Sequence, residues 1–570
     1  MLRLFKYLKP YKKQIIVVLA FLFLQTLSQL YLPNLMADIV DNGIAKGDIM
    51  HIWKTGGIMI GVAVLGMLFI LVATYLSSKV AMSFGRDLRL DLFSHIEDFS
   101  FHEFDKIGGS SLIIRATNDI TQVQQVTMMI LRVMVSAPLM AIGGILLSVS
   151  KDPRLSLILL IVIPLLSLLI VLIARKGIPL FKSMQKKLDT LNLVVRENLT
   201  GVRVIRAFNR LDYEEKRFDE ANLSLTDTAI KVNKLMALLM PVLMIFMNFT
   251  TVAILWYGSI RIDTGQIRIG DLMAFIQYAM FILFSLIMLS VVFIMIPRAS
   301  ASAQRINEVF QLSPSVCSPS LPKEPPAEKV TLRFEDVSFH YENAREAALS
   351  GLSFEASAGQ TVVVIGGTGS GKSTLVNLIP RFYDVSHGRI LLNGTDIRDM
   401  EMSSLRKRLG IVSQKPVLFT GTIRENLEIG SLEINEQDIH AALEAAQANE
   451  FIFGLKDGID TVISKDGANI SGGQKQRLSI ARALARKPDI YIFDDSFSAL
   501  DFKTDAMLRQ SLKEYTKDSV VIFVTQRVNS IMDADLVIVL EEGSLAGIGT
   551  HRTLMGSSAV YREIYNAQMG

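Results

Sequence analysis

The sequence predicts a membrane protein in which a six-helix α domain with long cytoplasmic helical extensions is fused to an α/β domain. Half of the 570 residues are hydrophobic, a high share for a cytosolic chain of this length. The apolar excess is confined to the N-terminal half. In the C-terminal half, strand-like and helix-like segments alternate, and a glycine-rich loop at 366–374 follows one of the strands. These features together predict the fold class.

Six apolar stretches are long enough to cross a bilayer, because a span needs about 20 apolar residues. They lie at about 15–33, 57–76, 133–149, 155–174, 235–257 and 272–297. Five cations precede the first stretch, and no small-residue cleavage site follows it. We therefore expect an uncleaved anchor with a cytoplasmic N-terminus. Six crossings return the chain to the cytoplasm, so we expect the C-terminal half to lie there.

Charge and cysteine content exclude several functions. The formal net charge is only +4, so nucleic acid is not an expected partner. The single cysteine, Cys317, excludes an intrachain disulfide and a cysteine-based metal site. Few ionisable residues occur at mid-depth in the apolar stretches, which leaves no proton relay or ion filter to propose.

Two long charged segments separate the second span from the third and the fourth from the fifth. The helical spacing of Leu88, Leu92 and Ile96 predicts that the spans continue as helices well beyond the bilayer. Each segment contains a break where a helix could turn back, at 101–111 and at 201–218. Composition alone leaves open whether these breaks have a function or are solvated, charged helix faces.

Composition also predicts the domain boundaries. Residues 1–312 hold the spans and their extensions. Residues 313–329 form a linker, because five prolines within 313–326 favour an extended chain. Residues 330–570 form an α/β nucleotide-binding domain, in which Gly and Asp turns separate the elements.

The glycine-rich loop follows the strand-like run Thr361–Ile365 and precedes a helix. Glycine suits such a turn because several backbone N–H groups must converge on one anion. Lys372 can reach the β- and γ-phosphates of ATP, and the Ser373 hydroxyl can ligate Mg²⁺. The helix N-terminus adds the positive end of its dipole. The expected nucleotide ligands in this loop are Gly366, Thr368, Gly369, Ser370, Gly371, Lys372, Ser373 and Thr374.

Two further segments belong with this loop. The run Ile490–Asp494 is typical of a buried strand ending in a carboxylate, and Asp494 would complete Mg²⁺ coordination with Ser373. The run Ile470–Gln474 opens a helix. With these motifs in order, the chain resembles an ATP-binding cassette (ABC) exporter half-transporter, one membrane domain fused to one cassette. The residues that resemble the family signature are Ser471, Gly472, Gly473 and Gln474.

The resemblance covers the whole chain and implies further roles. It implies that Tyr341 stacks on adenine, that Gln414 contacts Mg²⁺ or the attacking water, and that Asp501 lies in a loop crossing a cassette dimer interface. Two cassettes would face head to tail, so that the signature of one closes over the γ-phosphate held by the other. The breaks at 101–111 and 201–218 resemble coupling helices. The family also implies a multi-pass plasma-membrane protein with a cytoplasmic ATP-binding domain.

Two residues depart from the family pattern. Asp495 stands where an active cassette has Glu, and Gln526 stands where the switch His is expected. Asp is one methylene shorter and should polarise the attacking water poorly, and glutamine cannot carry a proton or a positive charge. These changes predict a degenerate, slowly hydrolysing site in a heterodimer whose second, non-identical half-transporter carries the Glu and the His. The alternative is an active homodimer that tolerates both variants.

Methionines recur at helical spacing in the fifth and sixth spans, and Met240, Met244 and Met280 are the candidate substrate contacts. Methionine is flexible and polarisable, which suits varied apolar ligands, but such stripes also occur in ordinary packing. We expect ATP-driven export of small hydrophobic or amphipathic compounds, drugs first, by alternating access. Lipid flipping and peptide export are alternatives, as is a non-transporting nucleotide-gated channel or regulatory subunit. A channel usually needs rings of charge, and none is evident.

Overall fold

The computed structural model describes the chain except residues 327–328, 343, 431–433, 499, 527–531 and 570. It divides into two compact units. The membrane unit comprises residues 1–97 and 109–312, and the ATP-binding unit comprises residues 98–108 and 313–570. The short segment 98–108 therefore packs with the ATP-binding unit although it lies between two long membrane helices in the sequence.

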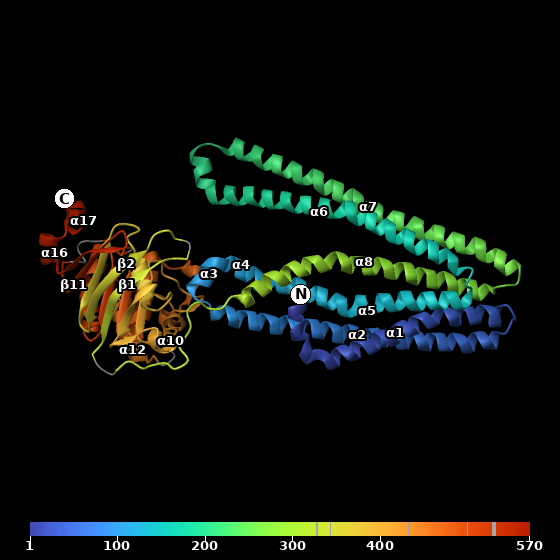
Figure 1. The fold of residues 1–570 in the computed structure, drawn as a ribbon, viewed down its shortest axis with the longest axis horizontal. Helices are drawn as coiled ribbons and strands as arrows, with labels where there is room; N and C mark the ends of the chain where they lie inside the picture. The colour runs from blue at the N-terminus through green and yellow to red at the C-terminus, as the bar shows by residue number, and fades with distance from the viewer. Residues whose placement is uncertain (327–328, 343, 431–433, 499, 527–531, 570) are drawn as a thin grey trace. The chain divides into compact units, whose positions relative to one another are not determined.

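The membrane unit is wholly helical in its described elements (Figure 1). Six of its helices are long and apolar enough to cross a membrane, which confirms the predicted spans and a multi-pass membrane protein. Most are far longer than the ~20 residues that a bilayer requires, so they also form the predicted extensions. The elements are η1 (Leu2–Tyr11), α1 (Lys12–Asp38), η2 (Ile39–Ile44), α2 (Ile49–Glu97), α4 (Gly109–Ile114), η3 (Arg115–Asp119), α5 (Ile120–Lys151), α6 (Ser156–Ala207), α7 (Leu211–Asp263) and α8 (Ile269–Gln311).

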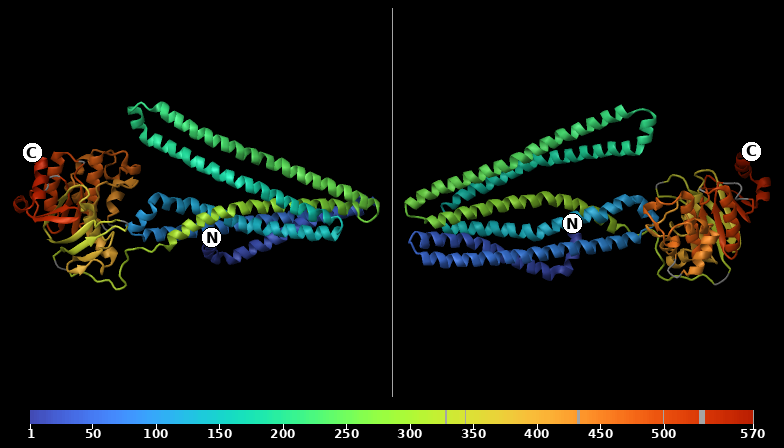
Figure 2. Two further views of the ribbon diagram at one scale, coloured as in Figure 1. Left: turned by 45° about the horizontal axis from the view of Figure 1, so that its top comes forward. Right: turned by 180° about the vertical axis from the view of Figure 1, so that it is seen from behind.

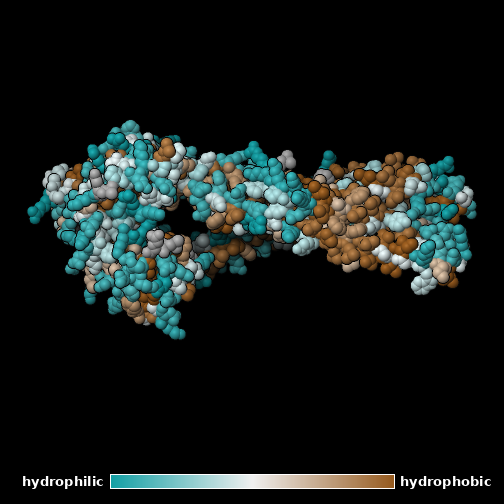
Figure 3. Space-filling model, turned by 90° about the horizontal axis from the view of Figure 1, so that it is seen from below, coloured by the Kyte–Doolittle hydropathy of each residue, from teal (hydrophilic) through white to brown (hydrophobic). Residues whose placement is uncertain are grey.

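Helices α6 and α7 form a hairpin that diverges from α1, α2, α5 and α8 toward its cytoplasmic tip (Figures 1 and 2). At the opposite, outer end an ion pair connects the hairpin to the rest of the membrane unit. Arg261 of α7 pairs at 2.6 Å with the buried Asp152, which lies in the connection between α5 and α6. A second ion pair, between Lys151 at the end of α5 and Asp271 of α8 at 2.7 Å, joins two helices outside the hairpin. An apolar band on the surface of this unit is bordered by hydrophilic surface at its outer end (Figure 3). This distribution matches a bilayer-spanning domain.

The two predicted breaks differ in form. The first contains α3 (Phe101–Ile107), which Gly108 separates from α4 with φ 81°. The second is shorter than the predicted range 201–218, because α6 runs to Ala207 and α7 begins at Leu211. Only residues 208–210 interrupt the helical hairpin there.

The ATP-binding unit contains three sheets. A four-stranded sheet has the order β2-β1-β4-β5, a six-stranded sheet has the order β12-β11-β3-β10-β9-β6, and β7 pairs with β8. The strands are β1 (Thr331–Phe339), β2 (Leu349–Ser357), β3 (Thr361–Gly366), β4 (His387–Leu392), β5 (Thr395–Asp396), β6 (Leu409–Val412), β7 (Gly421–Thr422), β8 (Val462–Ile463), β9 (Ile490–Asp494), β10 (Val520–Val524), β11 (Leu536–Glu541) and β12 (Ser544–Gly549).

Helices cover these sheets and enclose two apolar cores. They are α3, α9 (Lys372–Leu378), α10 (Met402–Lys407), α11 (Ile423–Glu428), α12 (Glu436–Ala445), α13 (Asn449–Phe453), η4 (Gly458–Asp460), η5 (Lys465–Gly467), α14 (Gly472–Ala485), α15 (Phe502–Tyr515), α16 (His551–Ser557) and α17 (Ala559–Met569). The pairing that positions the site is parallel. Val524 of β10 lies opposite both Val364 of β3 and Asp494 of β9, so the carboxyl ends of these strands meet at one edge of the sheet.

Candidate functional site

The glycine-rich loop connects β3 to α9, the strand-loop-helix arrangement expected from the sequence. Gly371 precedes α9 with φ 96°, and a Cβ there would lie 2.7 Å from the Ala348 carbonyl oxygen. A Cβ at Gly366 would collide with the Leu540 carbonyl oxygen. Side chains are therefore excluded from these two positions, and the loop backbone stays open to an anion.

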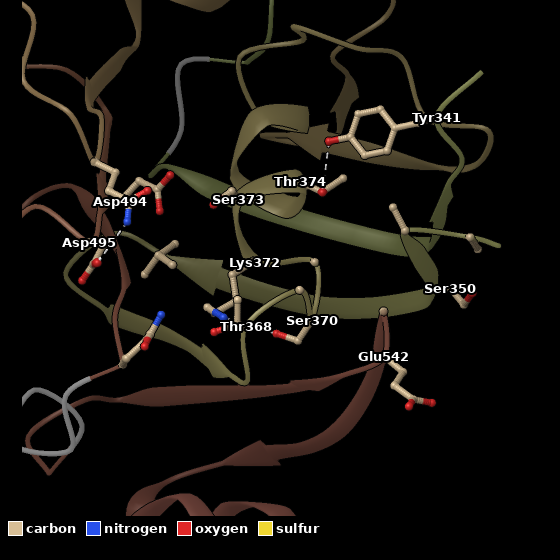
Figure 4. A pocket seen from close by; sticks show the side chains of 18 of the residues that line it. Tyr341, Ser350, Thr368, Ser370, Lys372, Ser373, Thr374, Asp494, Asp495 and Glu542 are labelled. Atoms are coloured by element: carbon tan, nitrogen blue, oxygen red, sulfur yellow. Dashed lines mark hydrogen bonds between the residues drawn. The ribbon is translucent and has the colours of Figure 1, made fainter. Parts of the chain in front are cut away.

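Lys372 is the first residue of α9, and its side chain folds back over the loop (Figure 4). Its Nζ donates to the carbonyl oxygens of Gly366 at 2.9 Å and Gly367 at 2.6 Å. The residue is only 8% exposed. Burial lowers the pKa of the Lys372 ammonium, and the nearby Asp494 and Asp495 oppose this shift. An anionic phosphate bound in the loop would raise the pKa of the Lys372 ammonium, as the two carboxylates do, and so stabilise its charged form.

Ser373 and Asp494 approach each other from α9 and β9. The Ser373 hydroxyl lies close enough to the Asp494 carboxylate to favour its charged form. Burial raises the pKa of Asp494, and the Asp495 charge adds to that shift, while Ser373 and Lys372 oppose it. A hydroxyl and a carboxylate are oxygen ligands that suit Mg²⁺, which usually takes its remaining ligands from water and substrate phosphates. Within the described residues no group of three or more His, Cys, Asp or Glu could hold a metal alone, so this pair fits Mg²⁺ bound together with a nucleotide.

Asp495, at the position of the expected base, has a constrained backbone. Its φ is 45°, and its N–H donates to the Val524 carbonyl oxygen at 2.9 Å. Its carboxylate accepts a hydrogen bond from Gln414 Nε2 at 3.3 Å (Figure 4). This bond occupies one of the carboxylate oxygens that would have to face the attacking water.

One cavity of about 950 Å³ brings most of the predicted residues together. Its lining includes the loop from Thr368 to Thr374, Asp494, Asp495 and Gln526, as well as Tyr341 and Gln414. Gln526 lies on its exposed rim, and its backbone carbonyl accepts from Gln568. The sequence analysis did not identify Glu346, Ser350 or Glu542, which also line the cavity; no local motif marks these residues.

The signature residues are absent from this cavity's lining. Ser471 caps α14, since its Oγ accepts from the Gln474 N–H at 3.3 Å while Gln474 Oε1 accepts from the Ser471 N–H at 2.8 Å. This reciprocal cap fixes the exposed start of the helix. Asp501 caps α15 in the same manner, accepting from the Thr504 N–H at 3.0 Å. Ala499, in the same predicted loop, lies outside the described residues.

Tyr341 belongs to an aromatic cluster beside the loop. Its hydroxyl bonds to Thr374 Oγ1 at 3.1 Å. The edges of its ring meet Phe339 and Tyr383, with centroid distances of 4.8 and 5.6 Å. The ring therefore has a fixed position at the cavity, as a platform for a planar base requires.

Helix α3 packs directly on this cluster. The Phe101 ring packs against the Phe382 ring at an interplanar angle of 43°, with centroids 4.5 Å apart, and the Tyr383 hydroxyl donates to Asp105 at 3.0 Å. His102 lies 2.8 Å from Glu342, the residue after Tyr341. Tyr383 thus touches both Tyr341 and α3. Tyr383 was not predicted as a functional residue, although the adjacent aromatic residues Phe382 and Tyr383 follow shortly after α9 and could have indicated it.

The methionine stripe has a mixed environment. Met240 and Met244 of α7 are 66% and 65% exposed within the single chain, and Met280 of α8 is half-buried. An apolar cavity of about 260 Å³ lies between α6, α7 and α8. Met236, not the three predicted methionines, contributes to its lining.

The chain is similar to known families and proteins over its whole length. A family model described as "ABC transporter transmembrane region" matches residues 15–287, and one described as "ABC transporter" matches residues 349–498. An "Uncharacterized ABC transporter ATP-binding protein" of Mycobacterium tuberculosis (strain CDC 1551 / Oshkosh) is 40% identical over 568 residues, 99% of this chain and 97% of the relative. The "Uncharacterized ABC transporter ATP-binding protein YfiB" of Bacillus subtilis (strain 168) is 40% identical and covers 99% of this chain and 98% of its own.

A more distant relative carries a specific activity in its name. An "ATP-dependent lipid A-core flippase" of Vibrio vulnificus (strain YJ016) is 30% identical, covering 100% of this chain and 97% of the relative. Among solved structures, "Structure of a bacterial Atm1-family ABC exporter with ATP bound" has a TM-score of 0.80 at 24% identity, covering 98% of each chain. That likeness shows the fold.

Proposed function

The chain belongs to the family of ABC transporters, and from this premise we propose that it is one subunit of an exporter of hydrophobic or amphipathic compounds whose own ATP site turns over slowly. Membership itself makes the chain a transporter ATPase that uses ATP with Mg²⁺. It also places the six apolar helices in the plasma membrane and the ATP-binding domain in the cytoplasm. The substrate, the slow site and the partner are the proposed parts.

In this proposal the loop residues hold ATP, with Lys372 on the β- and γ-phosphates and Ser373, Asp494 and Gln414 oriented toward Mg²⁺. The metal would neutralise phosphate charge. Tyr341 would support the adenine. Each role agrees with where its side chain lies around the 950 Å³ cavity.

The observation that carries the slow-site proposal is the pair formed by Asp495 and Gln414. The carboxylate at the base position is one methylene short, and the Gln414 amide donates to it at 3.3 Å. Both features hinder proton abstraction from water, because the shorter side chain reaches less far and the amide occupies one carboxylate oxygen, whereas a general base must lie within hydrogen-bond reach of the proton. Gln526 cannot supply a proton or a positive charge at the γ-phosphate. This site is therefore suited to retaining ATP.

If this chain's site hydrolyses ATP slowly, a working transporter needs a second site that hydrolyses ATP faster. The signature of this chain retains Ser471, Gly472, Gly473 and Gln474 at the start of α14, where Ser471 and Gly472 are exposed and the other two are half-buried. Asp501 lies on an exposed helix cap. We propose that these residues complete the ATP site of a second, non-identical half-transporter that carries the catalytic Glu and His. An active homodimer remains the alternative.

The contacts of α3 support a route from the ATP site to the membrane helices. We propose that Tyr383 links Tyr341 to Asp105 and thereby makes α3 sensitive to nucleotide in this site. Tyr383→Phe keeps the ring but removes the bond to Asp105, so it should reduce the stimulation of ATPase by transported compounds about two- to fivefold, the effect of losing ~0.5–1 kcal/mol. ATP affinity should change little, because the ring still supports Tyr341. ATPase titrations with substrate measure both quantities.

Asp105→Asn is the matched variant, since it weakens the same bond from the α3 side. It should reproduce the loss, and combining the two variants should add nothing further. Additive losses would show that the two residues act separately and would contradict the proposed link.

The methionine stripe provides the test of the transported class. Changing Met240, Met244 and Met280 together to Ala should alter which apolar dyes are exported more than it alters basal ATPase, if these side chains contact the transported compound, because such contacts set which compounds bind. Dye efflux and ATPase are measured on the same membranes. A parallel fall in the export of every compound, in ATPase and in protein yield would assign the methionines to packing.

Lipid flipping is the second candidate, favoured by the relatives named lipid A-core flippase. Fluorescent phospholipid translocation across proteoliposomes distinguishes it from dye export. If the Met240, Met244 and Met280 variant still translocates phospholipid in an ATP-dependent way, lipid flipping is favoured, because acyl chains do not need specific contacts with these three side chains.

A further inference from the structure

The start of the chain forms a cationic surface that the ATP cycle does not use. η1 is a 3₁₀-helix (Leu2–Tyr11) that runs across the direction of α1 (Figures 1 and 2). Side chains three positions apart eclipse one another in such a helix. One row therefore contains Arg3, Lys6, Lys9 and, at the junction with α1, Lys12. All four are exposed, and no acidic residue precedes Asp38 in the sequence.

Leu4 and Tyr7, three positions apart on another side of η1, pack this helix against the rest of the membrane unit. Leu4 is 1% exposed, and the Tyr7 ring stacks against Phe310 of α8 with centroids 6.4 Å apart. Two carboxylates of α2 accept hydrogen bonds from η1. The Tyr7 hydroxyl donates to Asp91, and the Tyr11 hydroxyl donates to Asp87 at 2.5 Å. Of the cationic row, the Lys6 ammonium lies over the rings of Tyr7 and Phe310, 4.9 and 5.9 Å from their centroids. Lys6 therefore borders the attachment but, like Arg3, Lys9 and Lys12, remains exposed.

The row lies beside the cytoplasmic boundary of the bilayer. Lys12 and Lys13 directly precede the first apolar stretch, and Ile16, one turn later, is 63% exposed, as a lipid-facing side chain is. Phe5 and Leu8 of η1 are half-buried, which leaves part of their apolar surface beside the cations. An apolar row next to a cationic row is the pattern of a helix in the membrane interface.

From these observations we propose that Arg3, Lys6, Lys9 and Lys12 bind the headgroups of anionic phospholipids in the cytoplasmic leaflet. That leaflet carries a negative surface potential, and each Lys or Arg near it strengthens binding about fivefold, equivalent to ~1 kcal/mol. Because Tyr7 and Tyr11 connect η1 to α2 and α8, bound lipid should also hold these cytoplasmic helix ends together. This inference is independent of the transported substrate and of the slow ATP site.

The test uses the full-length transporter in a neutral detergent mixed with equal amounts of anionic phosphatidylglycerol and zwitterionic phosphatidylcholine, with the lipid retained by the protein quantified by mass spectrometry. The row variant combines Arg3→Gln, Lys6→Gln, Lys9→Gln and Lys12→Gln and keeps Lys13. The control combines four exposed lysines of the ATP-binding unit, Lys329→Gln, Lys456→Gln, Lys513→Gln and Lys517→Gln. Both variants lose the same charge.

Wild-type protein should retain phosphatidylglycerol preferentially at low salt, and 0.5 M NaCl should remove most of that preference, about the ionic strength at which surface charges are well screened. The row variant should lose at least about tenfold in preference, the result of removing several fivefold contributions, and the control should match wild type. Equal losses in both variants would overturn the proposal. So would a wild-type protein with no preference at low salt, a result that does not depend on either variant folding.

Discussion

Lys372→Ala is expected to weaken ATP binding at this chain's site by about 10- to 100-fold. A hydrogen bond to a charged group contributes ~1.5–3 kcal/mol, and each 1.4 kcal/mol is about tenfold in affinity. The ammonium is held in place by the carbonyl oxygens of Gly366 and Gly367, so it is already positioned for a phosphate. Titration of the purified chain with a fluorescent ATP analogue measures the affinity.

Lys456→Ala is the control, because it removes an exposed lysine of the same unit far from the loop in sequence. Melting curves without nucleotide separate loss of binding from loss of folding. If Lys372→Ala melts like wild type and binds ATP with unchanged affinity, the loop does not hold phosphate in the way proposed.

Gly472→Glu is expected to have the largest effect, a loss of ~10²–10³-fold in the ATPase rate of the assembled transporter. The added carboxylate would repel the phosphate and keep the donors of the signature from reaching the developing charge, and the loss of one such donor typically lowers the rate by this amount. A Cβ at Gly472 would meet no atom within 4 Å, so the substitution leaves the fold of this chain intact. The loss must then arise where the signature closes over the partner's γ-phosphate, with a carboxylate facing a phosphate.

Gly556→Glu is a matched control for this change. Gly556 lies in α16, and a Cβ there also meets no atom within 4 Å. It adds the same charge at a position outside the site. Near wild-type ATPase in this control would assign the effect of Gly472→Glu to the signature itself.

The sequence predicted the spans and the strand-loop-helix arrangement of the glycine-rich loop correctly, because both depend on local patterns. A hydrophobic run of membrane length and a glycine spacing after a strand need no distant partner. The second break was predicted too long, because residues on either side of 208–210 keep helical patterns that hide where α6 ends. Helical periodicity fixes an element better than its boundary.

Contacts between distant residues were not predictable. Tyr383 and Asp105 are 278 positions apart, and Gln414 and Asp495 are 81 apart. Nothing in either local sequence specifies its partner, because tertiary packing brings them together. The roles of Tyr341, Gln414 and Asp501 were inferred from resemblance to a family, and the structure adds the contacts through which such roles could act.

The central claim is that this chain binds ATP in a slow site and completes a fast site on a different subunit. Steady-state ATPase of the assembled transporter tests it, comparing Asp495→Asn, Gly472→Glu and a Glu→Gln change at the partner's base position with wild type. We expect Asp495→Asn to lower the rate only modestly, whereas the other two should remove most of it, since a general base contributes ~10²–10⁴-fold. The chain purified alone should hydrolyse ATP slowly. Near-total loss from Asp495→Asn with little loss from Gly472→Glu, or vigorous turnover by this chain alone, would contradict the account.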